Sequence, residues 1–471
     1  MLGWANDHGW ARSPPDLKFR REERVSAIDV ADIIDQQKIS AFQARIVVMA
    51  WFTLFLDGID NQAIAYVAPA LSASWHLPRG ALGPVFAAGV VGVALGALII
   101  GPLADRYGRK RVLVSTVLYF AAMSLAITQA RDLTQLLVLR FLIGLGLGAV
   151  VPLAVVLVNE FAPRRRRAAM VTLTTCGYAM GAASGGLLAA QLVPIFGWTS
   201  MFYVGCAIPV LLALALAAWV PESIRLLTLR GNSEAIRGIL RKINPALAFP
   251  ADAQFTLRQE GTEAHAGSWR VVRLFKEGRT ATTLLIWFCF FMNLLVLNVL
   301  NNWLPTLVTH TGIPQEQAVR AATALQFGGM TGVITMGVLA DRFGFFKVLP
   351  FSFGVGAVFI ALIRVAGADL VMLVAMIFVA GFCNIGSQMT LAALTATQYP
   401  TDIRSTGVSW AHGVARLLSI AGLLLAGVLL SMNWPLAGLY DLVAVPMVCG
   451  SVAVLILAGV RRARQPAAAL A

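Results

Sequence analysis

Residues 101–111 read GPLADRYGRKR and residues 337–347 read GVLADRFGFFK, so one pattern of small residue, Asp-Arg pair and glycine occurs twice, 236 residues apart. A second landmark keeps this spacing, because Pro69 in YVAPAL and Pro305 in NWLPTL are also separated by 236 residues. A shared offset between unrelated landmarks indicates that the chain consists of two halves related by duplication.

Composition places both halves in a membrane. The chain has 471 residues, of which 58% are hydrophobic and 13% are charged, and its mean hydropathy is +0.76. About a quarter of the residues are charged in a soluble protein. Apolar runs such as VGVALGALIIGPLA belong to segments whose length is close to the ~20 residues that a membrane-spanning helix needs. The sequence therefore predicts an all-α membrane protein with twelve transmembrane helices in two pseudo-symmetric six-helix bundles.

The apolar segments set the expected boundaries. We predict spans at residues 44–70, 82–104, 111–129, 133–158, 166–190, 199–220, 281–309, 317–340, 346–364, 370–397, 405–430 and 437–460. They divide the chain into an N-terminal tail (1–43), an N-terminal bundle (44–220), a linker (221–280), a C-terminal bundle (281–460) and a C-terminal tail (461–471). The linker begins PESIRLLTLRGNSEAIRGILRKIN, which is typical of a short helix outside the membrane.

The basic residues indicate the orientation. With these spans, 31 of the 37 Lys and Arg residues lie on the side that holds both termini, and four lie on the other side. Basic residues concentrate in cytoplasmic loops, so both termini are expected in the cytoplasm of a bacterial cell whose inner membrane the chain crosses. The net charge of +14 is thus a topology signal, and no nucleic-acid partner is expected. Residues 1–40 lack the apolar stretch of a cleavable signal peptide.

The sequence offers no chemistry for an enzyme. The five cysteines fall inside predicted spans without close spacing, which favours packing over a disulfide or metal role. The glycine rows at 144–148 and 177–186 favour close helix packing, since neither follows a strand as a nucleotide-binding loop would. No nucleophile–base pair or metal cluster is evident, so no cofactor is expected.

The stretch TLFLDGIDNQAIAYVAP, residues 53–69, places Asp57 and Asp60 in an apolar span. Their counterparts in the second half are Asn293 and Val296, so the duplicated scaffold does not require the carboxylates. A charge at the bilayer centre costs at least about 2.5–3.5 kcal/mol, and such residues are functional by default. A raised pKa would let either acid bind a proton near neutral pH. The alternative is a structural hydrogen bond to a neighbouring helix.

Two arginines inside predicted spans could pair with these acids. Arg140 lies in LLVLRFLIGLGLG and Arg416 in SWAHGVARLLSI. The planar guanidinium matches a carboxylate in a bidentate manner, so either arginine could hold an anionic substrate. Arg140 could instead be an interfacial anchor. His412 precedes Arg416 by four residues and shares its helix face; it could relay protons or be a core histidine.

The loop GPLADRYGRKR, its copy, and PES at 221–223 resemble the major facilitator superfamily. The resemblance implies a gating role for Asp105, Arg106 and Arg109, and for Asp341 and Arg342 in the copy. An acid at a helix end beside basic residues can make charge-assisted hydrogen bonds that hold one conformation closed. The alternative for the basic cluster is topology anchoring alone.

A closer resemblance is carried by FLDGIDNQAIAYVAPAL, LLVLRFLIGLGLGAVVP, NNWLPTL and RSTGVSW. These stretches resemble the aromatic acid:H+ symporter family, especially bacterial 4-hydroxybenzoate and protocatechuate permeases. The resemblance implies that Asp57 and Asp60 are required for uptake. It also gives functional roles to Arg140 and Arg416, and to Glu160 and Arg404, which we expect to act in gating. Glu160 precedes PRRRR and could pair with the loop arginines, or it could be a simple solvated charge.

An aromatic carboxylate needs apolar walls and a few hydrogen-bond donors besides a cation. The polar candidates on the later spans are Asn298, Asn302, Trp303, Gln326, Asn384 and Gln388. Each alone could equally make an interhelical hydrogen bond. The expected function is a monomeric, proton-coupled importer of aromatic carboxylates. Alternatives are a symporter of another organic anion such as muconate, an exporter, or a membrane sensor without flux.

Overall fold

The computed structural model describes residues 28–468 except 246, 248, 250–254, 257–270, 368 and 401–402. Its described part contains twelve helices that are long and apolar enough to cross a membrane. The first six are α2 (Ala41–Ser74), α3 (Gly83–Tyr107), α4 (Arg109–Ile127), α5 (Leu133–Phe161), α6 (Arg164–Phe196) and α7 (Ser200–Trp219). The second six are α11 (Thr280–Thr309), α12 (Gln315–Phe343), α13 (Phe345–Ala366), α14 (Leu370–Gln398), α15 (Arg404–Ser431) and α16 (Leu436–Ala468).

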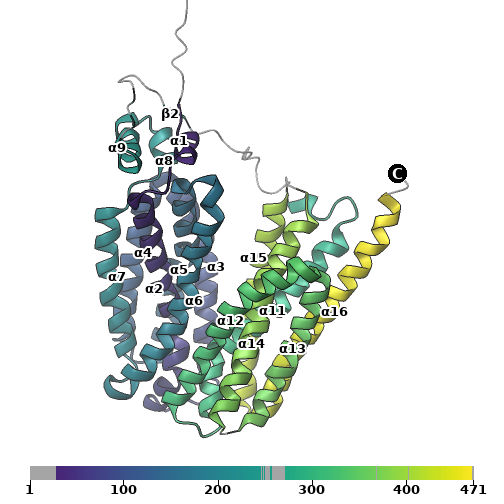
Figure 1. Ribbon diagram of the computed structural model, residues 1–471. Helices are drawn as coiled ribbons and strands as arrows, with labels where there is room; N and C mark the ends of the chain where they lie inside the picture. The colour runs from purple at the N-terminus through teal and green to yellow at the C-terminus, as the bar shows by residue number, and fades with distance from the viewer. Residues whose placement is uncertain are drawn as a thin grey trace, which may run out of the picture.

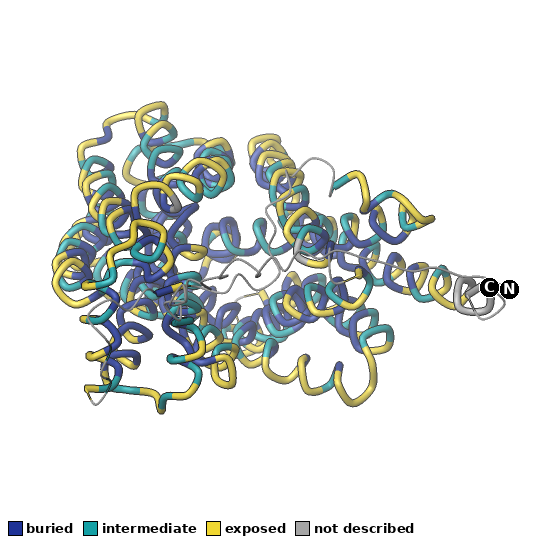
Figure 2. The backbone as a smooth tube through the Cα atoms, turned by 90° about the horizontal axis from the view of Figure 1, so that it is seen from above, coloured by how far each residue is buried: buried dark blue, intermediate teal, exposed yellow. Residues whose placement is uncertain are grey.

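These helices form the two expected bundles, and the fold-class prediction is confirmed (Figure 1). Figure 2 shows that exposed residues lie mainly on the outer circumference of the bundles, where an apolar surface would meet lipid. Local sequence sets several helix starts. Ser40 and Gln43 form a reciprocal capping box at α2, and the carboxylates of Asp132 and Asp369 accept backbone N–H groups at α5 and α14.

The repeated loop motif has the same backbone form in both halves. Gly108 ends α3 with φ 113°, and Gly344 ends α12 with φ 85°. Both angles lie in a region that a residue with a Cβ atom rarely adopts, which explains why the motif carries glycine there. The next helix begins directly after each glycine. The motif is therefore a sharp reversal between two spans.

The duplication extends to helix packing. A Cβ atom at Gly96 of α3 would lie 2.0 Å from the carbonyl oxygen of Leu145 in α5. A Cβ atom at Gly332 of α12 would lie 2.2 Å from that of Phe382 in α14. The two glycines are separated by the same 236 residues as the loop motifs. Each half thus brings two backbones together through small residues, as membrane helices commonly do.

The two bundles touch at one end, here called the far end (Figure 1). A Cβ atom at Gly80, before α3, would collide with the carbonyl of Gly427 in α15. The rings of Phe86 and Trp303 pack edge to face with centroids 5.0 Å apart, which joins α3 to α11. At the opposite end, called the linker end, the bundles diverge in the ribbon view, and α8 and α9 lie on the N-terminal bundle.

A small assembly covers the N-terminal bundle at the linker end. It contains β1 (Ile28–Asp29), α1 (Val30–Gln36), α8 (Ile224–Leu229), α9 (Ser233–Ile243) and β2 (Phe255–Thr256), with β1 and β2 paired in parallel. The sequence predicted one short helix at the start of the linker. Two are present because Gly231, with φ 64°, interrupts the chain between α8 and α9.

Candidate functional site

The first charged group lies inside the N-terminal bundle, where α2, α4 and α5 meet. Asp60 and Arg140 are buried, with 2% and 4% of their surfaces exposed. Arg140 Nη1 lies 4.0 Å from Asp60 Oδ2, and Ser124 Oγ donates a hydrogen bond of 3.0 Å to Asp60 Oδ1. The structure thus brings together two of the residues singled out in the sequence and adds the hydroxyl of Ser124.

This ion pair is loose. Its separation of 4.0 Å exceeds hydrogen-bond length, and Asp60 Oδ2 and Arg140 Nε and Nη1 have no hydrogen-bond partner in the described chain. Buried polar atoms normally have partners, so three such atoms around one pair indicate a place for a proton, a water molecule or a ligand oxygen. Gly89 and Gly205 lie beside the pair, where a side chain would fill the space.

A second cluster of charged and polar side chains contains residues of both bundles. Asp57 of α2 is buried, with 4% of its surface exposed, and Arg416 of α15 lies within electrostatic range of its carboxylate. Tyr178 of α6 lies within range of both. Its hydroxyl accepts a hydrogen bond of 2.6 Å from Asn61 Nδ2. His412 is partly buried, and its ring packs against Phe290 with centroids 4.8 Å apart.

Three polar candidates of the C-terminal bundle bond to neighbouring side chains or to their own helix. Asn298 Nδ2 donates to Ser419 Oγ at 2.7 Å, which joins α11 to α15. Asn302 Nδ2 donates to the carbonyl of Asn298, one turn earlier, at 2.9 Å. Gln326 Nε2 of α12 donates to Asn301 Oδ1 at 2.9 Å. Asn301 and Ser419 were not among the candidates named from the sequence. Each is a single uncharged residue in an apolar helix, and hydropathy alone does not separate such a residue from its neighbours.

The other three candidates are deeply placed. The indole N–H of Trp303 donates to the carbonyl of Leu423 at 3.3 Å, and its ring belongs to the contact between the bundles. Asn384 is fully buried and exchanges amide-to-carbonyl hydrogen bonds with Asn293. Gln388 is 8% exposed on the same helix. Asn384 therefore joins α11 to α14 inside one bundle.

The linker end of the N-terminal bundle holds a charged network around the first loop motif. Arg109, at the start of α4, forms an ion pair with Glu160, near the end of α5. Glu160 also accepts a hydrogen bond of 2.8 Å from Ser223 Oγ. Glu222 accepts the backbone N–H groups of Lys110 and Ser223, both at 3.0 Å. These contacts fasten the beginning of the linker to the loop between α3 and α4.

The second loop motif is different. Asp341 and Arg342 are exposed, and Arg342 lies over the ring of Phe343 rather than beside an acid. Arg404 is exposed at the start of α15. In the first motif, Arg106 lies over the Tyr107 ring, and the Asp105 side chain lies outside the described part. The network around Arg109 and Glu160 thus has no equivalent among the described residues of the copy.

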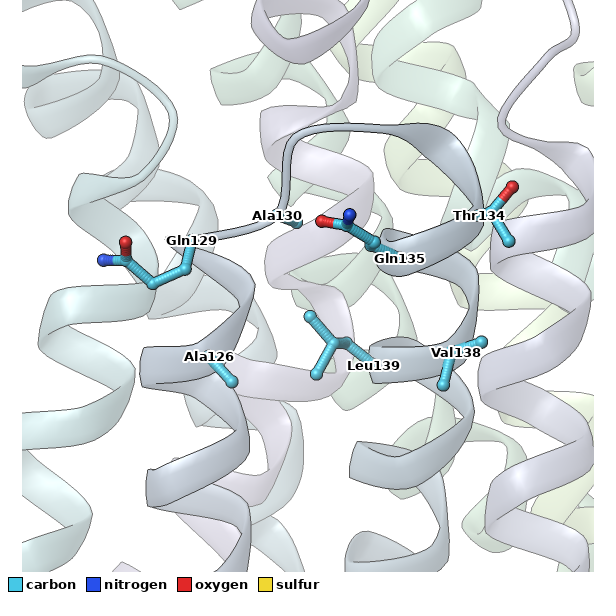
Figure 3. A pocket seen from close by; sticks show the side chains of 7 residues that line it. All are labelled: Ala126, Gln129, Ala130, Thr134, Gln135, Val138 and Leu139. Carbon is cyan, nitrogen blue, oxygen red and sulfur yellow. The ribbon is translucent and has the colours of Figure 1, made fainter.

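Two further features lie outside this arrangement. Among the described residues, no three His, Cys, Asp or Glu side chains gather as a metal site would require. A surface pocket of about 390 Å³ lies where α4 ends and α5 begins (Figure 3). Its lining carries two amides and no charged group, which makes it unsuited to an organic anion. The lining residues are Ala126, Gln129, Ala130, Thr134, Gln135, Val138 and Leu139.

Comparison with known proteins agrees with the fold. A sequence model described as Major Facilitator Superfamily matches residues 50–332 and 286–470. The structure is similar to that of a D-xylose–proton symporter, with a TM-score of 0.66, 17% identity, and coverage of 88% of this chain and 97% of the other. At this identity the likeness concerns the fold.

Curated relatives are closer in sequence. The 4-hydroxybenzoate transporter PcaK of Pseudomonas putida is 38% identical over 91% of this chain and 96% of its own length. A gallate transporter of the same species is 38% identical over 91% and 94%. A benzoate transport protein of Acinetobacter baylyi is 32% identical over 93% and 94%. The chain is a multi-pass membrane protein of the major facilitator superfamily, in the group that contains these aromatic acid transporters.

Proposed function

We propose that this protein is a proton-coupled secondary transporter that imports aromatic carboxylates resembling 4-hydroxybenzoate across a bacterial inner membrane. The substrate class rests on relatives that match almost the whole chain and are named as transporters of 4-hydroxybenzoate and gallate. The observation that carries the mechanism is the burial of Asp57 in one bundle, within electrostatic range of Arg416 on the other. An acid and a base on opposite bundles can couple ligand binding to the relative movement of the bundles.

The coupling follows from charge balance. While Asp57 is ionised, its carboxylate and Arg416 neutralise each other in a buried site. A proton on Asp57 removes the negative charge and leaves Arg416 able to bind the carboxylate of the substrate. Proton and anion then enter together, because either alone leaves an uncompensated buried charge. One proton per monoanion makes the cycle electroneutral, so the ~2.3 kcal/mol per charge per 100 mV of membrane potential does not act on it.

The loose Asp60–Arg140 pair supplies a second exchangeable site within the N-terminal bundle. We assign Asp57 and Asp60 together to the binding of one proton, and Arg140 and Arg416 to the carboxylate of one substrate molecule. His412 and the polar groups of α11, α12 and α14 would contribute to the shape and polarity of the substrate site between the bundles. The contribution of Asn384 would be indirect, through its hydrogen bonds with Asn293 that hold α14 against α11.

Alternating access would follow from rocking of the two bundles about this region. We assign the linker end to the cytoplasm, because 31 of the 37 basic residues lie on that side. The bundles touch at the far end, so this arrangement would open toward the cytoplasm. The Arg109–Glu160 network and the second loop motif, with Asp341, Arg342 and Arg404, would act as gates at the linker end.

Uptake of labelled 4-hydroxybenzoate into proteoliposomes, with and without an inward proton gradient, tests the proposal. Wild type should accumulate the acid only with the gradient, and Asp57→Asn should not accumulate it. Asp32→Asn is a matched control, because Asp32 is exposed on α1, outside the bundles. Accumulation of muconate but not of aromatic acids would change the substrate. Binding without flux would favour a sensor, and gradient-driven efflux would favour an exporter.

A further inference from the structure

Tyr178 of α6 and Asn61 of α2 form a polar pair beside the charged groups. The Asn61 amide donates to the Tyr178 hydroxyl at 2.6 Å. Both side chains are partly buried, whereas Asp57 and Asp60 on the same stretch of α2 are nearly fully buried. The pair is therefore more accessible than the acids beside it.

The backbones that carry this pair are held together closely. A Cβ atom at Gly58 would lie 2.1 Å from the carbonyl oxygen of Tyr178, and one at Gly181 would lie 1.8 Å from that of Phe55. Such contact between α2 and α6 leaves no room for the helices to shift against each other. The backbone of Tyr178 is thus fixed relative to that of Asp57 and Asn61, and the hydrogen bond from Asn61 orients the hydroxyl.

The hydrogen-bonding capacity of the pair is only half used. The Tyr178 oxygen accepts from Asn61, and its O–H has no acceptor in the described part of the chain. The Asn61 amide oxygen likewise receives no hydrogen bond there. One free donor beside one free acceptor complements a hydroxyl group, which both donates and accepts. A carboxylate only accepts, and the neighbouring Asp57 would repel it when ionised.

We propose that Tyr178 and Asn61 recognise a hydroxyl substituent on the aromatic ring of the substrate, while Arg416 holds its carboxylate. The proposal rests on the function proposed above and assigns within it the residues that distinguish hydroxylated from unsubstituted acids. Loss of one neutral hydrogen bond typically changes affinity by about tenfold. Because the pair is partly accessible to solvent, we expect weaker discrimination between hydroxylated and unsubstituted acids than a fully buried polar site would give.

Uptake of benzoate and of 4-hydroxybenzoate by Tyr178→Phe tests this assignment. The preference of wild type for the hydroxylated acid, taken as the ratio of the two kcat/KM values, should fall about tenfold, because uptake of 4-hydroxybenzoate falls more than uptake of benzoate. Asn61→Ala should move the ratio in the same direction and provides a second test if Tyr178→Phe is poorly inserted. Tyr203→Phe is the matched control, because Tyr203 is 50% exposed on the outer face of α7.

Equal loss of both acids in Tyr178→Phe, or an unchanged ratio in both variants, would overturn the assignment while leaving the transporter in place. Failure of wild type to accumulate any aromatic acid would remove the proposed function itself. The two failures are therefore separate.

Discussion

Arg140 Nη1 lies 4.0 Å from Asp60 Oδ2 inside the N-terminal bundle, and neither atom has a hydrogen-bond partner in the described chain. Two buried charges at this distance attract each other without the directional contacts that would lock them together. Because arginine stays charged, a proton on Asp60 would leave Arg140 as an uncompensated buried charge until an anion enters, so the protonation of Asp60 is tied to the charge of its surroundings.

The first prediction concerns this pair. Arg140→Met leaves the buried Asp60 carboxylate without its counter-charge and, among the described residues, with only the Ser124 hydroxyl bonded to it, which should lower the free energy of unfolding by about 3–5 kcal/mol. Adding Asp60→Asn removes the orphan charge and should restore most of the loss. Thermal unfolding of the single and double variants in detergent measures both effects. Simple additivity of the two single changes would show that the residues do not interact.

The second prediction concerns the network at the linker end. Glu160→Gln keeps a hydrogen bond to Ser223 but loses the charge that attracts Arg109. A charge-assisted hydrogen bond contributes about 1.5–3 kcal/mol, so the linker should detach more often and trypsin should cleave it at least about tenfold faster. Asp341→Asn, in the exposed copy of the motif, is the control. Equal cleavage of Glu160→Gln and wild type would contradict a fastening role.

The third prediction concerns the glycine contacts repeated in both halves. Gly96→Ala and Gly332→Ala each place a Cβ atom against a carbonyl oxygen of the facing helix. Because backbones rather than flexible side chains collide, we expect each to cost at least about 3 kcal/mol, the upper range for overpacked cores. Gly101→Ala and Gly337→Ala are controls on the same two helices, with nothing within 4 Å of the added atom. Equal melting temperatures in all four variants would reject this packing.

The fourth prediction concerns pH at the far end. Partial burial, and secondarily the neighbouring Arg79, lower the pKa of His310 below its ordinary value. The neutral form is thus favoured while the bundles touch there. Lowering the pH through and below 6.5 should charge His310 beside Arg79 and favour separation of the far end, by less than about threefold because exposed charges are screened.

One spin label in the loop of Arg79, between α2 and α3, and one in the loop of His310, between α11 and α12, measure this separation at pH 5 and pH 8. Wild type should show a larger separated population at the lower pH, and His310→Gln should lose that difference. High salt should also reduce it. A pH response that persists in His310→Gln would assign the effect to another group.

Much of the fold was predictable because hydropathy and the repeat act along the chain. The spans beginning at residues 133 and 370 start where α5 and α14 start, since Asp132 and Asp369 cap them. The helix α1 was not predicted. Its seven residues are too short and too polar for a periodic signal, and it is held by contacts with distant segments, such as Asp35 with Arg164.

The candidate site was predictable in part for the same reason. Asp57, Asp60, Arg140 and Arg416 are conspicuous because charges are costly in apolar helices. Tyr178, Asn61 and Ser124 are uncharged, and their relation to the acids depends on how α2, α4 and α6 pack. Nothing along the chain distinguishes Asn384, which bonds inside one bundle, from an amide that lines a shared space.

The most direct test of proton coupling through Asp57 separates exchange from accumulation in Asp57→Asn. An amide at position 57 is permanently neutral, like the protonated acid, so the variant should exchange labelled for unlabelled substrate across the membrane yet fail to concentrate it under a proton gradient. Wild type should do both and carry one proton per anion, recorded with a pH-sensitive dye inside the vesicles. Gradient-driven accumulation that survives Asp57→Asn would show that proton coupling does not pass through Asp57.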